Sequence, residues 1–238
     1  MTTQINLGDI TVDVILKDIK NVHLSVYPPT GRVRISAPMR MRADTIRVFA
    51  ISKLDWIKQQ QKKLYAQERE TRRDFVERES HYLWGKRFLL VVSEVDEPPS
   101  VEVKHNRILL QVRPRSDLAK RNAVVEQWYR EQLKNAVPQL LAQWQPLLKV
   151  RVEQIFVQRM KTRWGSCNHY SQTIRLNTEL AKKPAECLEY ILVHEMLHLL
   201  EPTHNARFVA LMNQFMPKWE VLRRSLNRLP VGHADWTY

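Results

Sequence analysis

The chain contains only two cysteines, Cys167 and Cys187, among its 238 residues. Two thiols cannot build the disulfide framework that stabilises small secreted proteins, so we expect a reducing, cytoplasmic environment. No run of 18 apolar residues is present, and Met1 does not begin a secretory signal, so we expect no association with a membrane. The sequence shows no internal repeat, no low-complexity tract and no recognised nucleic-acid-binding motif.

The remaining composition is that of a globular protein with a strong excess of positive charge. Hydrophobic residues make up 44% of the chain, which is long enough for one large domain or two small ones. The formal net charge of +13 favours anionic partners, so we expect nucleotides or weak association with nucleic acid. Most of the excess lies in the first 150 residues. It therefore does not by itself define a site.

The segment His194-Glu195-Met196-Leu197-His198 reads H-E-x-x-H and is the most informative part of the chain. Residues four apart share a helix face, so two imidazoles can bind one metal ion, and Glu195 can take a proton from a water held there. Its flanks are apolar, and burying such polar groups is costly unless they are paired or ligate a metal. We predict His194 and His198 as metal ligands and Glu195 as the catalytic base.

Two residues compete for the role of third ligand. Pro202 cannot continue a helix, so the chain should turn at or before Glu201 and can bring His204 back toward the metal. The spacing from His198 to His204 is that of the metzincin signature, although Glu201 stands where that signature has a glycine. We predict His204 as the third ligand, with Glu201 as the alternative in a two-histidine, one-carboxylate site.

Around this motif the chain resembles the YgjP-like family of zinc metallopeptidases, which are relatives of SprT-like and WLM-type zincin domains. The resemblance is strongest from about residue 150 to 225 and weaker in the N-terminal half. It implies a gluzincin-like fold, zinc held by three histidines, and a glutamate base. Some members have been described as acting on nucleoside triphosphates. The matching residues are Arg163-Trp164-Gly165-Ser166-Cys167, Ile174-Arg175-Leu176-Asn177, Leu180, Pro184, the segment from Tyr190 to Leu199, His204, Phe208, Pro217 and Trp219, with Trp56-Ile57 and Leu83-Trp84-Gly85 further upstream.

Hydrophobic periodicity predicts an α+β chain. We expect residues 1–114 to form a β-rich region with one long helix, packed on a zincin-like, gluzincin-type hydrolase domain at 115–238. The predicted strands are 10–15, 22–26, 33–36, 88–92, 101–112, 151–158 and 173–177, and the predicted helices are 44–70, 117–144, one holding the H-E-x-x-H motif, and 206–226.

A cationic segment precedes the metal-binding motif. If residues 158–164 form an edge strand, Arg159, Lys161 and Arg163 alternate onto one of its faces. Facing the cleft, three cations would bind an anionic ligand such as phosphate. The alternative is an ordinary solvated strand face.

Three further side chains have chemistry that can serve a site. Tyr190 lies one helical turn before His194 and can face the substrate as an electrophile, or it can be a core residue with its hydroxyl at the rim. Cys167 with His169 is a formal nucleophile pair. We set that pair aside because sequence neighbours rarely form such a pair and no orienting carboxylate is evident.

These observations support three hypotheses. The first is a zinc metallopeptidase, in which Glu195 deprotonates a metal-bound water. The alternative is a metal-dependent nucleoside triphosphate pyrophosphatase, for example acting on UTP, with the cationic segment holding the phosphates. The third is a nucleic-acid-binding protein with a structural metal, which would normally need four protein ligands. Zn²⁺ is the expected cofactor, and Mn²⁺ or Mg²⁺ can also occupy such sites. The oligomeric state stays open.

Overall fold

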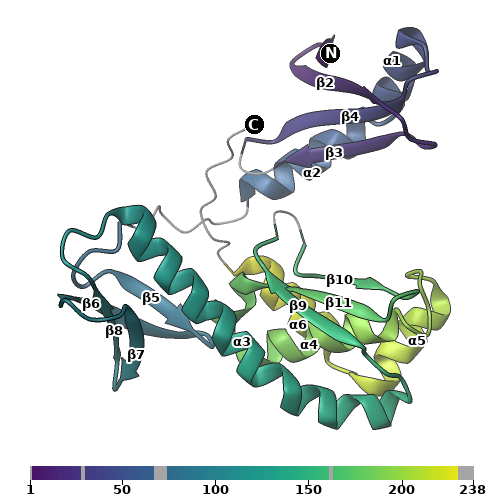
Figure 1. The fold of residues 1–238 in the computed structure, drawn as a ribbon. Helices are drawn as coiled ribbons and strands as arrows, with labels where there is room; N and C mark the ends of the chain where they lie inside the picture. Colours follow the sequence, from purple (N-terminus) through teal and green to yellow (C-terminus); the bar gives the residue numbers. More distant parts are fainter. Residues whose placement is uncertain (1, 28–29, 67–73, 161–162, 230–238) are drawn as a thin grey trace. The chain divides into compact units, whose positions relative to one another are not determined.

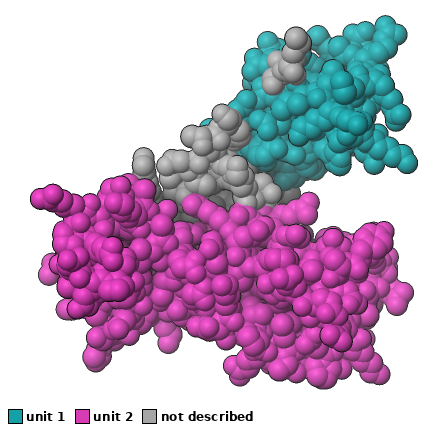
Figure 2. All heavy atoms as spheres, viewed as in Figure 1, with its two compact units in different colours: residues 1–69, 234–238 teal, residues 70–233 magenta. Residues whose placement is uncertain are grey.

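The computed structural model describes residues 2–27, 30–66, 74–160 and 163–229, and it has the α+β architecture that the sequence predicts. Two compact units are present, one of residues 1–69 with 234–238 and one of residues 70–233 (Figure 2). Residue 114, the predicted end of the β-rich region, lies inside the second unit between a strand and a helix.

The first unit is a four-stranded sheet followed by two helices. Its elements are β1 (Thr2–Leu7), β2 (Ile10–Lys17), β3 (His23–Tyr27), β4 (Arg32–Pro38), α1 (Ala43–Ser52) and α2 (Leu54–Ala66). The strand order is β1-β2-β4-β3, with a parallel central pair and two antiparallel outer pairs. Alternating strand residues such as Val12 and Ile35 are buried together with Ile46 and Ile57 of the helices. This unit therefore has a hydrophobic core of its own.

The helix predicted over 44–70 is wrong as a single element, because it divides at Lys53. The Ser52 hydroxyl donates to the Phe49 carbonyl at 2.8 Å, which a continuous helix would offer to the Lys53 N–H. That N–H instead donates to the Ala50 carbonyl. A serine side chain that competes with the backbone in this way favours the end of a helix. Lys53 is the single residue between α1 and α2. Residues 67–70 of the prediction lie outside the described residues.

The second unit begins with another four-stranded sheet. Its strands are β5 (Ser80–Leu83), β6 (Lys86–Glu94), β7 (Ser100–Lys104) and β8 (Arg107–Val112), in the order β5-β6-β8-β7. The strand predicted over 101–112 is wrong as one element, because a two-residue turn at His105 and Asn106 folds it into the β7–β8 hairpin. The central pair is parallel and both outer pairs are antiparallel, as in the first unit. The structure thus repeats a topology that the sequence did not reveal.

A long helix, α3 (Leu118–Leu148), follows this sheet. The Asp117 side chain caps its start by accepting the Lys120 N–H at 2.8 Å. Figure 1 shows α3 running from the β5–β8 sheet to the last part of the chain, and its buried residues join one continuous core that includes both. The β5–β8 sheet and the last part of the chain therefore belong to one packed body.

The last part of the chain combines a small sheet with four helical segments. These are β9 (Gln154–Gln158), β10 (Gly165–Asn168), β11 (Thr173–Asn177), the 3₁₀ segment η1 (Thr178–Lys182), α4 (Ala185–Leu197), α5 (Ala206–Phe215) and α6 (Trp219–Arg228). The order is β10-β11-β9, so β10 lies at an edge, and it packs against α4. The helix predicted over 206–226 divides at Pro217, which cannot continue α5. None of the helices in the described ranges has the length and apolar character needed to cross a membrane.

Candidate metal centre

Helix α4 carries the H-E-x-x-H motif, as the sequence predicts, and its surroundings are apolar. Leu192, Val193, Met196 and Leu197 are fully buried. His194 lies within the helix, His198 is the first residue after its end, and His204 directly precedes the Asn205 cap of α5. The three histidines thus come from one helix, its C-terminal end and the loop that follows.

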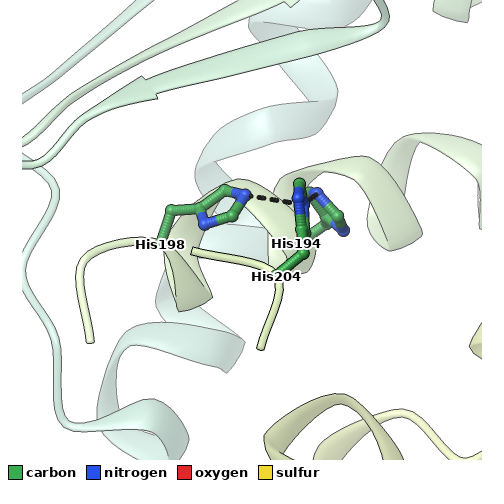
Figure 3. Close-up of side chains that lie close together, drawn as sticks. All are labelled: His194, His198 and His204. Carbon is green, nitrogen blue, oxygen red and sulfur yellow. Dashed lines mark hydrogen bonds between the residues drawn. The ribbon is translucent and has the colours of Figure 1, made fainter. Parts of the chain in front are cut away.

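The three imidazoles converge on one point (Figure 3). The Nε2 atom of His204 lies 3.0 Å from that of His194 and 3.1 Å from that of His198. The structure therefore groups His204 with the motif histidines, and among the described residues it adds no fourth histidine, cysteine or carboxylate to the group. Glu201, the alternative ligand, is not part of it.

The loop between His198 and His204 is held by Glu201 instead of a glycine. The backbone carbonyl of Glu201 lies 3.0 Å from His198 Nδ1 and can accept a hydrogen bond from an N–H there. In that tautomer the free lone pair of the ring is on Nε2. The Glu201 carboxylate accepts the Thr203 hydroxyl at 3.1 Å. Asn205 accepts the Phe208 N–H at 3.0 Å and starts α5. Glu201 thus shapes the turn that returns His204 to the motif.

Phe208 lies against all three histidines. Its ring centroid is 4.9 Å from that of His194, 4.7 Å from that of His198 in a stacked arrangement, and 4.8 Å from that of His204. The side chain is only 2% exposed. One buried ring therefore fixes the orientation of three imidazoles, a role that the sequence did not suggest.

The protonation of this cluster suits a cation. Burial, together with the charges of His198, His204 and Arg223, lowers the pKa of His194 to about 3. Burial also lowers the pKa of His198. An imidazole with a lowered pKa is neutral at pH 7 and can offer its unprotonated nitrogen to a cation. Three nitrogen donors of this kind fit Zn²⁺ or a similar divalent ion.

The side chain of Glu195, a residue of α4, lies against Gly165 of the edge strand β10. It is 6% exposed, and burial raises the pKa of its carboxyl group to about 7, although the charge of Arg163 acts in the opposite direction. A carboxyl group that titrates near neutral pH can both accept and return a proton. This is the property that the predicted base requires.

Arg159, Met160, Arg163 and Trp164, the described residues of the cationic segment after Gln158, do not belong to a strand, because β9 ends at Gln158 and β10 begins at Gly165. The buried Asn177 holds the segment instead, donating to the Met160 carbonyl at 2.9 Å and to the Arg163 carbonyl at 2.8 Å. Side chains on a loop need not alternate, so the predicted common face is lost. Lys161 lies outside the described residues.

The charges of the two described arginines of this segment act on different carboxylates. The charge of Arg163 partly offsets the rise that burial causes in the pKa of Glu195. Burial alone would raise the pKa of Glu179, but Lys182, Lys183 and Arg159 lower it overall. Arg163 therefore lies near the candidate base, whereas the charge of Arg159 acts on Glu179, which forms a buried ion pair with Lys182 at 2.6 Å.

Sequence reasoning missed a second cation near the histidines. The guanidinium of Arg223 lies 6.0 Å from the Trp219 ring on α6, a helix that packs against α4. Its charge acts on His194 and Tyr190. The signal was hidden because Arg223 lies far from the motif in sequence, and only the packing of α6 on α4 brings it near.

Tyr190 and Cys167 also lie near the centre. Tyr190 is buried, with its ring edge-on to His194 at 6.0 Å. Burial and then the charge of Glu195 raise the pKa of Cys167 to about 11, and a protonated thiol is a poor nucleophile. The His169 ring contacts the Tyr170 ring in a tilted arrangement, with centroids 4.0 Å apart. These contacts give no support to a Cys167–His169 pair.

Comparison with known proteins assigns a family. No curated protein matches the chain. Among solved structures, the metallopeptidase zymogen jannalysin of Methanocaldococcus jannaschii has 20% identity and a TM-score of 0.33, covering 40% of this chain and 92% of its own. The zymogen abylysin of Pyrococcus abyssi has 22% identity and a TM-score of 0.35, covering 40% of this chain and 99% of its own. Both scores are low, so the assignment rests on the sequence. The model of the YgjP-like family, metallopeptidase domain, matches residues 20–229, and the chain therefore belongs to this family.

Proposed function

We propose that this protein is a zinc-dependent peptidase with a zincin-like, gluzincin-type site. The observation that carries the proposal is the convergence of three imidazole Nε2 atoms beside a buried glutamate whose carboxyl group titrates near pH 7. His194, His198 and His204 would hold the ion. A divalent cation bound there supplies a Lewis acid that lowers the pKa of water and polarises a carbonyl group.

The residues of the chain would then divide the work. Glu195 accepts a proton from the attacking water on its carboxylate and returns it to the nitrogen of the leaving amine. Strand β10 is the edge of its sheet and packs against α4, so an extended peptide can pair with it beside Glu195. Tyr190 is too deeply buried to be given more than a packing role against His194. Two free cysteines fit a reducing, cytoplasmic setting.

A second candidate is hydrolysis of nucleoside triphosphates at the same site. The observation in its favour is the pair of cations near the centre, Arg163 by Glu195 and Arg223 by His194. Guanidinium groups bind phosphate oxygens well, and triphosphates bring the negative charge that such groups favour. A peptide with a carboxylate near the scissile bond would satisfy the same cations, so we rank this candidate second.

The test compares wild-type protein with Glu195→Gln, each loaded with Zn²⁺, on unfolded protein and on a panel of nucleoside triphosphates. Removing the base should lower turnover of the true substrate by about 10²–10⁴-fold, because glutamine cannot accept the proton. Zn²⁺ binding by the histidines should persist. Peptide products that depend on Glu195 would support the peptidase, whereas pyrophosphate release that depends on Glu195 would favour the second candidate.

Arg163→Ala then separates the two chemistries. Loss of triphosphate turnover with peptide cleavage retained would assign Arg163 to phosphate binding. Neither activity in the wild-type protein, with Zn²⁺ bound, would reject hydrolysis and favour a structural metal.

A further inference from the structure

Gly165, the first residue of β10, has no backbone reason to be glycine. The residue belongs to a regular strand paired with Leu176 of β11, and it is not among the residues with positive φ. Glycine inside a strand weakens it and often marks a close approach by another group. The reason for glycine at this position should therefore be sought in what lies next to it.

The neighbour is the candidate base. A Cβ atom at position 165 would lie 2.7 Å from Glu195 Oε1, 2.8 Å from Glu195 Cγ and 2.9 Å from Ile191 Cγ2. All three separations are shorter than carbon and oxygen atoms tolerate. The side chain of Glu195 thus occupies space that is open only because residue 165 carries no side chain.

We infer that Gly165 is a positioning residue that sets where the Glu195 carboxylate lies. This inference rests on the proposed function for what Glu195 does, but the contact itself does not. The backbones of α4 and β10 are held by their packing and pairing, whereas the carboxylate is the free end of a flexible side chain. A methyl group at position 165 would therefore displace the carboxylate before it displaces either backbone.

The effect on catalysis should be separable from an effect on the metal. In Gly165→Ala the three histidines keep their places, so Zn²⁺ affinity should stay within about threefold of wild type. The turnover number should fall about 100-fold with KM little changed, because the base moves while the substrate-binding edge remains. A merely structural role for Gly165 would lower Zn²⁺ affinity and turnover together.

A double-mutant cycle tests the contact without needing any activity. Unfolding temperatures are measured, with the metal removed by a chelator, for wild type, Gly165→Ala, Glu195→Ala and the double variant. The fall in unfolding temperature caused by Gly165→Ala should be at least halved when Glu195→Ala is already present. The remaining fall is due to the contact with Ile191. Gly85→Ala is the matched control, because a Cβ at position 85 would meet Pro184 and not Glu195. Its loss should be the same in both backgrounds.

Each outcome decides the inference. Equal losses for Gly165→Ala in both backgrounds would overturn it, as would full turnover by that variant. If Gly165→Ala does not fold alone, folding of the double variant would support the contact, and failure of both would contradict it. If the cycle shows coupling but the wild-type protein cleaves no peptide, the proposed function is rejected and the contact between Gly165 and Glu195 is retained.

Discussion

The β1–β4 sheet and the β5–β8 sheet share one topology but are stabilised differently. In both, two antiparallel hairpins join through a parallel central pair, so that β2 and β4 correspond to β6 and β8. Among the described residues, the core of the first sheet is completed by residues of α1 and α2. The second sheet contributes its apolar face to a core that also contains α3 and α4, the helix of the H-E-x-x-H motif. The second sheet therefore shares a core with the candidate site.

The turn of the first hairpin shows how this difference arises. In the second sheet, the Trp84 N–H donates to the Ala181 carbonyl of η1 at 2.8 Å, and Gly85 lies against Pro184 at the start of α4. In the first sheet, Gly8 of the corresponding turn, between β1 and β2, has no non-neighbouring atom within 4 Å of where a Cβ would be. Equal strand order therefore does not give equal roles, because the turn sequence decides what each hairpin contacts.

The largest difference between the two sheets is expected when one buried side chain is shortened at the same place in each. Ile35 of β4 and Leu110 of β8 are both fully buried at corresponding register positions, opposite Val14 and Val92. Ile35→Ala and Leu110→Ala should each cost about 2–5 kcal/mol of stability through the cavity left behind. If the folded histidine cluster binds Zn²⁺ as proposed, the ion should raise the unfolding transition lowered by Leu110→Ala and not the one lowered by Ile35→Ala. Calorimetry with and without Zn²⁺ measures both shifts.

A single transition, lowered by both substitutions and raised by Zn²⁺, would contradict this. The two cores would then unfold together, and the first sheet would contribute to the stability of the centre despite its separate core. The shared topology would be the better guide to the energetics in that case.

A smaller effect is expected from the ring that orients the ligands. Phe208→Ala should lower Zn²⁺ affinity by about 10–100-fold, because the three imidazoles would lose the surface that orders them before the ion binds. Competition with a chromogenic chelator measures the affinity. Val209→Ala, at the adjacent and more exposed position of α5, is the control and should bind Zn²⁺ as wild type does. Equal affinities in all three proteins would assign Phe208 to core packing alone.

The local parts of the site followed from the sequence. The H-E-x-x-H spacing predicted a helix, and α4 carries His194 and ends at Leu197, with His198 as its C-cap. Pro202 predicted the turn that returns His204 to the motif. Both signals act over a few residues, where helix geometry and proline stereochemistry leave little choice. Packing places the Glu201 carboxylate on Thr203 and its carbonyl toward His198, whereas His204 groups with the two motif histidines. His204 as the third ligand stays a prediction.

The features that the sequence did not reveal depend on contacts between distant segments. Asn177 bonds the carbonyls of Met160 and Arg163, 17 and 14 residues away, at described positions of the cationic segment that lie outside β9 and β10. The reason for a glycine at position 165 emerges only from the packing of β10 against α4, which brings Glu195 against it. The break at Lys53 came from one hydroxyl bond, and such competition is hard to foresee from periodicity.

The smallest expected effect is a difference between the two sheets in how their stability depends on pH. Asp13 of β2 is buried and accepts bonds from Arg32 and from Gln4, the latter at 3.0 Å, whereas the corresponding position in β6 is Val91. Burial alone would raise the pKa of Asp13, but these bonds and the charges of Arg32 and Arg34 lower it overall. The stabilisation is therefore fully present above the ordinary pKa of 3.8 and is lost as pH falls through the lower folded value. Asp13→Asn should lower the first unit's unfolding temperature at neutral pH. The difference from wild type should shrink as pH falls through the lowered folded pKa of Asp13, because the carboxyl group is then protonated in both the folded and the unfolded protein. A difference that stays constant with pH would mean that the geometry of the bonds, and not the charge of Asp13, stabilises this sheet.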